Sequence, residues 1–152
     1  KESVNIFSEL GELNKIKIEN SGTISVFISK DSKTIISGNS DSTIRFFDLS
    51  NGSELKKIKT VLLTSIFVDK NNNYILSTHQ DKTIRLWDFN TGNEVRAFKG
   101  HENIVNKALI TSDNKFIVSI SLDKTIRIWD LEKGDELNKS SVYVSIKKDE
   151  EK

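Results

Sequence analysis

One eight-residue pattern recurs three times in this chain and constrains its fold more than any other feature. It reads DSTIRFFD at residues 41–48, DKTIRLWD at 81–88 and DKTIRIWD at 123–130. The closing aspartates of the three copies lie 40 and 42 residues apart. A degraded copy, VNIFS at residues 4–8, ends 40 residues before the first. A fixed period of this length indicates a repeat architecture, in which each unit packs on its neighbours.

Each repeat is expected to hold four short β-strands. In the second repeat the four runs are residues 64–68, 74–77, 83–87 and 94–98. They are rich in Ile, Val, Phe and Thr and are bounded by Asp, Asn, Gln and Gly, as antiparallel strands joined by tight turns are. A glycine follows the third strand of every repeat, where a hairpin needs a positive φ: Gly52, Gly92 and Gly134. No segment has helical periodicity, so the predicted fold class is all-β, with blades of four antiparallel strands.

The repeats resemble those of the WD-repeat family. The Trp-Asp pairs at residues 87–88 and 129–130 match the dipeptide that names the family, and Phe47-Asp48 is a relaxed version. Gly100-His101 matches the Gly-His pair that opens a repeat. The resemblance covers nearly the whole chain and implies an incomplete β-propeller of about three and a half blades. Its expected parts are residues 1–18 (outer strands of a preceding blade), 23–60, 63–99 and 103–140 (three blades), 141–146 (first strand of a following blade) and 147–152 (a polar tail).

The resemblance also implies a buried hydrogen-bond network inside each blade. The third repeat has all four members: His101, Ser119, Asp123 and Trp129. In this arrangement Asp123 accepts from the ring of His101, whose other nitrogen bonds Ser119. The serine oxygen then accepts from the indole N–H of Trp129.

The first two repeats depart from that pattern. The second keeps Ser77, Asp81 and Trp87 but has Lys59-Thr60 where Gly-His would stand. The first keeps Ser37 and Asp41, and its Phe47 has no indole donor. These two blades are therefore expected to rely more on apolar packing, and His101→Ala is expected to destabilise the fold more than His79→Ala.

Two further features of the repeats predict structural roles. Ile84 and Leu86 are expected to face one neighbouring blade while Trp87 and Trp129 face the other. An arginine recurs at one strand position, which favours ion pairing between strands over ligand binding: Arg45, Arg85 and Arg127.

Catalytic and metal-binding interpretations find little support. Ser119, His101 and Asp123 have the composition of a nucleophilic triad, but the buried network explains them better and no Gly-x-Ser-x-Gly elbow occurs. Asp69, Asn71 and Asn73 have calcium-loop spacing without the glycine and glutamate that such a loop needs. The chain has two histidines and no cysteine for a zinc site, and no phosphate-binding glycine motif. No catalytic residue, metal or cofactor is expected.

Composition favours proteins as partners. Lys plus Arg number 23 and Asp plus Glu number 22, so no long-range field would gather nucleic acid. No apolar run approaches the ~18 residues of a membrane-spanning helix, so no membrane insertion is expected. The chain starts at Lys1 and has no methionine, which suggests a processed chain or an excerpt. The rest of the propeller would then come from the parent chain or from a partner chain. Alone, the arc is expected to be oligomeric or insoluble.

Partners are expected to meet the loop faces and the central mouth, because packing occupies the strands. The family resemblance places a partner-binding rim at Ser40, His79, Gln80, Glu102, Asn103 and Leu122. The predicted function is a non-catalytic protein-interaction scaffold in a larger intracellular assembly, cytoplasmic or elsewhere, with cytoskeletal and ciliary complexes included. Two alternatives stay open: a peptide-recognition module such as a substrate receptor of a ubiquitin ligase, and a scaffold domain attached to an enzyme elsewhere in the parent chain.

Overall fold

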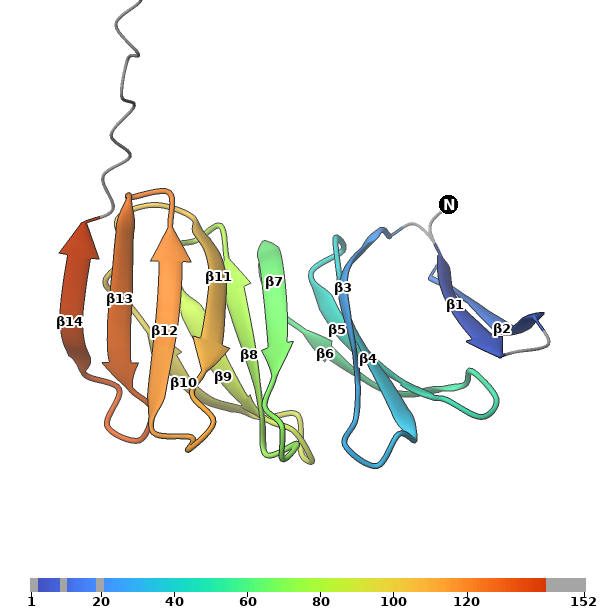
Figure 1. The fold of residues 1–152 in the computed structure, drawn as a ribbon. Coiled ribbons are helices and arrows are strands. Elements are labelled where there is room, and N and C mark those ends of the chain that lie inside the picture. The colour runs from blue at the N-terminus through green and yellow to red at the C-terminus, as the bar shows by residue number, and fades with distance from the viewer. Residues whose placement is uncertain (1–2, 9–10, 19–20, 142–152) are drawn as a thin grey trace, which may run out of the picture.

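The computed structural model describes residues 3–8, 11–18 and 21–141. The chain begins with an antiparallel hairpin of β1 (Ser3–Ser8) and β2 (Gly11–Lys17). Three antiparallel four-stranded sheets follow, each with its strands in chain order (Figure 1). The strands of the first blade are β3 (Thr23–Ile28), β4 (Thr34–Asn39), β5 (Thr43–Asp48) and β6 (Glu54–Lys59).

The second blade consists of β7 (Leu63–Val68), β8 (Tyr74–His79), β9 (Ile84–Asp88) and β10 (Glu94–Phe98). The third consists of β11 (Val105–Ile110), β12 (Phe116–Ser121), β13 (Thr125–Asp130) and β14 (Glu136–Ser141). The all-β fold class and the four-stranded blades are therefore confirmed. Ser141 ends β14 and does not begin a further strand, and the rest of the strand expected at 141–146, like the tail at 147–152, lies outside the described residues.

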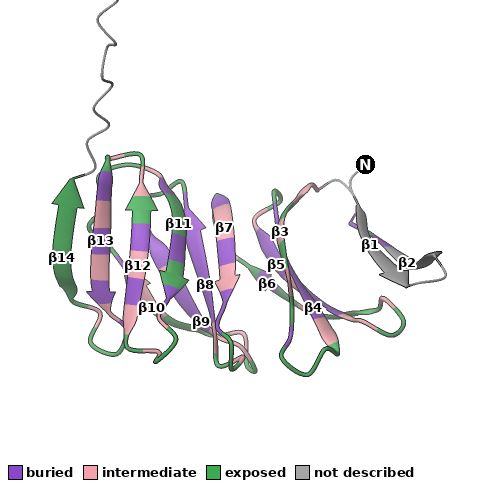
Figure 2. Ribbon diagram, viewed as in Figure 1, coloured by how far each residue is buried: buried purple, intermediate pink, exposed green. Residues whose placement is uncertain are grey.

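The blades stand side by side along an open arc (Figure 1). The first strands of neighbouring blades lie beside one another, since β7 contacts both β3 and β11. Outer strands such as β14 are exposed along their length, whereas β8 and β9 are largely buried (Figure 2). In the parts of the chain that the structure describes there is no helix, and hence none with the length and apolarity that a membrane crossing requires.

The core lies between blades, as stacking of repeats requires. Ile84 and Leu86 pack with Trp129 of the third blade, while Trp87 packs with Ile44 of the first. The predicted division is confirmed, because each Trp faces the preceding blade and Ile84 and Leu86 face the following one. Burying such side chains contributes about 1.5–3 kcal/mol each, so the blades are stable mainly through their neighbours.

The two ends of the arc leave blade faces uncovered. The hairpin packs Ile16 and Ile18 on the outer part of the first blade, against Ile35 and Phe47. The inner part stays open, with relative exposures of 40%, 50% and 61% for three apolar side chains of β3: Ile24, Val26 and Ile28. The residues of β7 and β11 that correspond to Val26 and Ile28 are buried: Ile66, Val68, Ala108 and Ile110. At the other end, Leu109 and Ile120 of the third blade are exposed.

Candidate functional site

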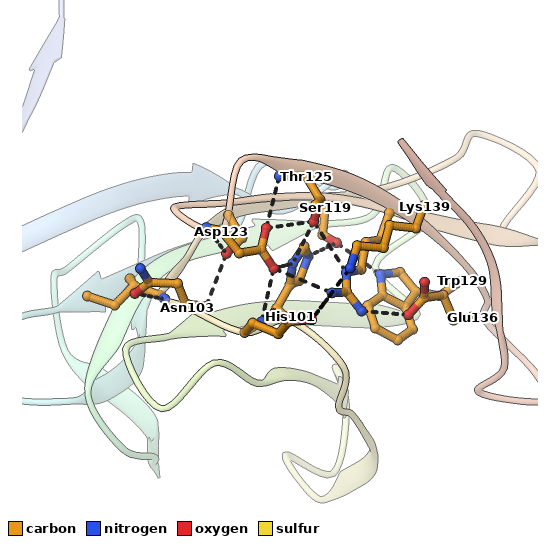
Figure 3. A network of polar contacts seen from close by, with 12 residues as sticks. His101, Asn103, Ser119, Asp123, Thr125, Trp129, Glu136 and Lys139 are labelled. Carbon is orange, nitrogen blue, oxygen red and sulfur yellow. Dashed lines mark hydrogen bonds and ion pairs between the residues drawn. The ribbon is translucent and has the colours of Figure 1, made fainter. Parts of the chain in front are cut away.

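The polar network of the third blade links the loop before β11, the turn between β12 and β13, and these two strands (Figure 3). His101 precedes β11, and its Nδ1 lies 2.7 Å from Oδ2 of Asp123. Its Nε2 lies 2.8 Å from Oγ of Ser119, which accepts from Nε1–H of Trp129 at 2.9 Å. The geometry is the relay that the WD-repeat resemblance implies, and every ring nitrogen in it has a partner.

Burial sets the charge states of this network. It lowers the pKa of His101 despite the neighbouring Asp123 carboxylate, so the ring is neutral at neutral pH. A neutral ring with its proton on Nδ1 donates to Asp123 and accepts from the Ser119 hydroxyl. Burial opposes ionisation of Asp123, yet hydrogen bonds from Thr125 and from the backbone N–H of Glu102 outweigh it and lower the pKa of Asp123.

Ser119 has the wrong surroundings for a nucleophile. The residue is 1% exposed and lies in the middle of β12, with its oxygen already bonded to His101 and Trp129. A substrate could reach this hydroxyl only by separating two blades. The arrangement therefore supports the structural interpretation over the triad.

His79 belongs to a buried network and not to the rim. The prediction of a rim position for this residue was wrong, because its side chain has no exposed surface. Nε2 of His79 lies 2.7 Å from Oγ of Ser77, which accepts from Nε1–H of Trp87 at 2.7 Å. Nδ1 bonds the backbone carbonyl of Val61. The second blade thus has its own imidazole–serine–indole chain. The expectation that this blade relies more on apolar packing for want of such a network was wrong.

Loop length explains the different origin of the imidazole. Four residues separate Ile58 from Leu63, whereas six separate the equivalent Phe98 from Val105. The longer loop brings His101 in from outside the sheet and accounts for the 42-residue spacing. The shorter loop carries no histidine, and His79 supplies the ring from β8, two residues after Ser77. Residues i and i+2 of a strand point to the same face, so both side chains enter the same space.

Asn39 occupies the corresponding position of the first blade. The residue has no exposed surface, and its Nδ2 lies 3.1 Å from Oγ of Ser37 and 3.2 Å from the backbone oxygen of Thr43. Phe47 stands where the other two blades have a tryptophan, and its ring has no N–H to donate. The three blades therefore fill one polar position in three ways: with a loop histidine, a strand histidine or a strand asparagine.

The recurring arginines form repeated ion pairs, as the sequence indicates. Each joins the aspartate of the preceding turn to a glutamate at the start of the fourth strand. Arg45 pairs with Asp41 and Glu54, at 2.6 and 3.0 Å. In the second blade Arg85 pairs with Asp81 and Glu94. In the third, Arg127 pairs with Asp123 and Glu136, and its side chain is 4% exposed.

The calcium-loop candidate is a turn. Asp69 is buried and accepts from the backbone N–H groups of Asn71 and Tyr74 and from Nδ2 of Asn114 in the next blade. Its carboxylate therefore closes its own turn and joins two blades. Among residues 3–8, 11–18 and 21–141 no group of His, Cys, Asp and Glu side chains is placed to hold a metal ion.

The other rim residues lie at one end of the blades. Ser40, Gln80 and Leu122 are exposed and follow the second strand of their blades, and Glu102 and Asn103 are exposed in the loop before β11. Backbone hydrogen bonds join these two kinds of loop, from Gln80 N–H to Leu62 O and from Leu122 N–H to Ile104 O. Sequence reasoning missed Val61 and Leu62, which are also exposed here, at 42% and 53%. Two adjacent apolar residues in a short loop were the available signal.

Comparison with known proteins decides the family. The family model "WD domain, G-beta repeat" matches residues 13–48, 55–88 and 92–130, well over half of the chain. The chain belongs to the WD40 family. In this family the fold is generally a scaffold for protein interactions and is typically non-catalytic. None of the curated proteins matches this WD40 chain in sequence.

Solved structures show the same fold. The WD40 β-propeller domain of Doa1 is 21% identical, with a TM-score of 0.78 over 92% of this chain and 47% of that one. The structure of U3-55K is 15% identical, with a TM-score of 0.77 over 84% of this chain and 42% of that one. The WD40 chain thus spans less than half of either structure. At these identities the likeness concerns the fold alone.

Proposed function

We propose that this chain is a non-catalytic protein-interaction scaffold, part of a WD40 propeller in a larger intracellular assembly. The observation that carries the proposal is that the faces of the blades are buried whereas the loops at one end are exposed. Blade faces are buried against each other, and the titratable groups of the networks are already bonded to one another. The rim residues are left exposed at one end: Ser40, Gln80, Glu102, Asn103 and Leu122. Partners are therefore expected to bind across loops of several blades.

Strands from elsewhere in the parent chain, or from a partner chain, would complete the ring. The support is the open inner face of β3, where Ile24, Val26 and Ile28 are exposed and the positions of Val26 and Ile28 are buried in the other blades. β1 and β2 supply only a two-stranded sheet at this place in the arc. Two inner strands would cover the apolar face and pair with the free edge of β1.

Affinity purification of the full-length protein tests the scaffold function. Partners that the wild type retains should be lost when charges are placed on the rim, as in the double variant Gln80→Lys with Leu122→Asp. They should be kept by a matched pair of exposed changes on outer strands, Leu55→Asp with Val95→Asp, since both positions are more than 40% exposed. Loss of the same partners from both variants, or from neither, would rule out the rim as the binding surface.

A further inference from the structure

The backbone of Leu62 has a conformation that no repeated turn explains. Seven non-glycine residues of the described chain have a positive φ. Six of them occupy two turn positions that recur in every blade: Ser32, Asn72, Asn114, Ser42, Lys82 and Lys124. Leu62 is the seventh, with φ of 40°. A left-handed leucine costs free energy, and such outliers persist where surrounding structure enforces them.

His79 provides that enforcement. Its buried ring bonds the carbonyl of Val61, and the carbonyl of Leu62 accepts from Gln80 N–H at 2.9 Å. Both peptide groups of the loop are thereby held to the end of β8. The side chains of Val61 and Leu62 consequently point outward, 42% and 53% exposed, instead of turning into the core. His79 is thus a positioning residue for an exposed apolar pair.

Leu122 exposes a further apolar side chain at the same end of the third blade. It is 51% exposed and is joined to the loop before β11, which starts beside β7: Oγ1 of Thr64 donates to the carbonyl of Val105 at 2.6 Å. The starts of β7 and β11 lie together at the upper end of the arc in Figure 1. We call Val61, Leu62 and Leu122 the rim patch.

Unpaired positive charge borders the rim patch. Lys59 precedes the loop of Val61 and Leu62, and Lys82 and Lys124 occupy the tips of the adjoining turns. All three are exposed and make no ion pair with any described residue. The acidic groups at this end are engaged: Asp81 with Arg85, Asp123 with His101 and Arg127, Glu102 with Lys139.

We infer that the rim patch binds a protein segment in which bulky apolar side chains are flanked by aspartate or glutamate. The apolar side chains would cover Leu62 and Leu122, and the carboxylates would meet the three free lysines. This inference rests on the proposed scaffold function and names its partner class. Single-stranded nucleic acid fits less well, because it needs aromatic surfaces for stacking, and none of the exposed large apolar side chains in the described chain is aromatic.

Fluorescence anisotropy with the full-length protein tests the inference. The probe is a labelled acidic peptide carrying two leucines, compared with the same peptide with serines in place of the leucines and with a labelled single-stranded RNA. The leucine peptide should bind at least about tenfold more tightly than the serine peptide, and its affinity should fall as salt rises. Lys82→Glu and Leu122→Ser should each weaken binding about tenfold, whereas Lys70→Glu at the opposite end and Val95→Ser on β10 should not.

Leu62→Gly separates binding from stability. Glycine accepts a positive φ without strain, so this variant should melt at the same temperature as the wild type or higher, while it binds the peptide at least about tenfold more weakly. Equal affinity for the leucine and serine peptides, tighter binding of RNA, or unchanged binding by Leu62→Gly would overturn the inference. If partners from cells still depend on the rim in that case, the scaffold function stands and only the partner class falls.

Discussion

His79 and His101 each bring an imidazole to the serine–tryptophan pair of their own blade, but from different parts of the chain. His79 reaches Ser77 from within β8, and His101 reaches Ser119 from the loop before β11. Both rings are buried, and burial lowers the pKa of each below its ordinary value of 6.5. The two side chains thus serve one structural purpose at positions that do not align in the repeat.

Replacing either histidine should therefore destabilise the fold to a similar degree, in place of the larger effect at His101 that the repeat pattern alone predicts. His79→Ala and His101→Ala each remove the acceptor of a buried serine hydroxyl and the ring partner of a second polar group, the Val61 carbonyl or the Asp123 carboxylate. This costs about 1–3 kcal/mol per site. The free energy of unfolding from urea denaturation measures the effect. Gln80→Ala, exposed and adjacent to His79, is the control and should change stability by less than about 0.5 kcal/mol. A His79→Ala variant as stable as that control would show that the bond to Val61 contributes nothing.

Much of this could be predicted from the sequence, and the failures have physical reasons. The period, strands and arginine pairs follow from residues that recur in register. The prediction of a rim position for His79 failed because this residue lies one position before an exposed turn, and neighbours of a turn are usually expected at the surface. Its relation to Ser77 was the better guide, since residues two apart on a strand share a face. Asn39 could have been found in the same way. The positive φ of Leu62 could not be predicted from the sequence, because it depends on hydrogen bonds that join this loop to His79 and Gln80.

The ion pairs should differ in value although their residues repeat. Arg127 is nearly buried beside Asp123, whereas Arg85 and its partners Asp81 and Glu94 are about a quarter to a third exposed. Arg127→Met takes the arginine charge away from the nearly buried Asp123 carboxylate and should cost about 3 kcal/mol. Arg85→Met should cost about 1 kcal/mol or less, because solvent screens the charges that remain. Urea denaturation of the two variants compares them, and equal losses would contradict the role assigned to burial.

Acid should destabilise the chain in two steps. The pKa of His79 and of His101 is lower in the folded state, so the unfolded chain binds protons first as the pH falls below about 6.5. Their contribution to stability is therefore complete above that pH and is lost below it. Asp41, Asp81 and Asp123 also have lowered pKa values, and their contribution is lost below the ordinary value of 3.8.

Denaturation at a series of pH values checks both steps. A variant with His79→Asn and His101→Asn should lack the first step and keep the second, because only the histidines titrate near neutrality. Constant stability of the wild type between about pH 7 and pH 5 would contradict the first step.

The open face of β3 should make residues 1–152 self-associate. Light scattering is expected to show oligomers, because Ile24, Val26 and Ile28 present an apolar strip beside the free edge of β1. Replacing all three with threonine should shift the distribution toward monomer. The same change at Leu55, Val95 and Leu137, which are exposed on outer strands, should not. A monomeric wild type would show that this face needs no cover.

The origin of the imidazole decides how freely each loop at the mouth can diverge. In the second blade the loop of Val61 and Leu62 gives the buried network only a backbone carbonyl, which any residue could supply. Its side chains can therefore be exchanged for those that suit a new partner while the interior stays intact. In the third blade the side chain of the loop residue His101 is part of the buried network. A substitution at this position therefore lowers the stability of the fold, whatever it does for binding. Evolution of binding is accordingly easier at one blade than at the next.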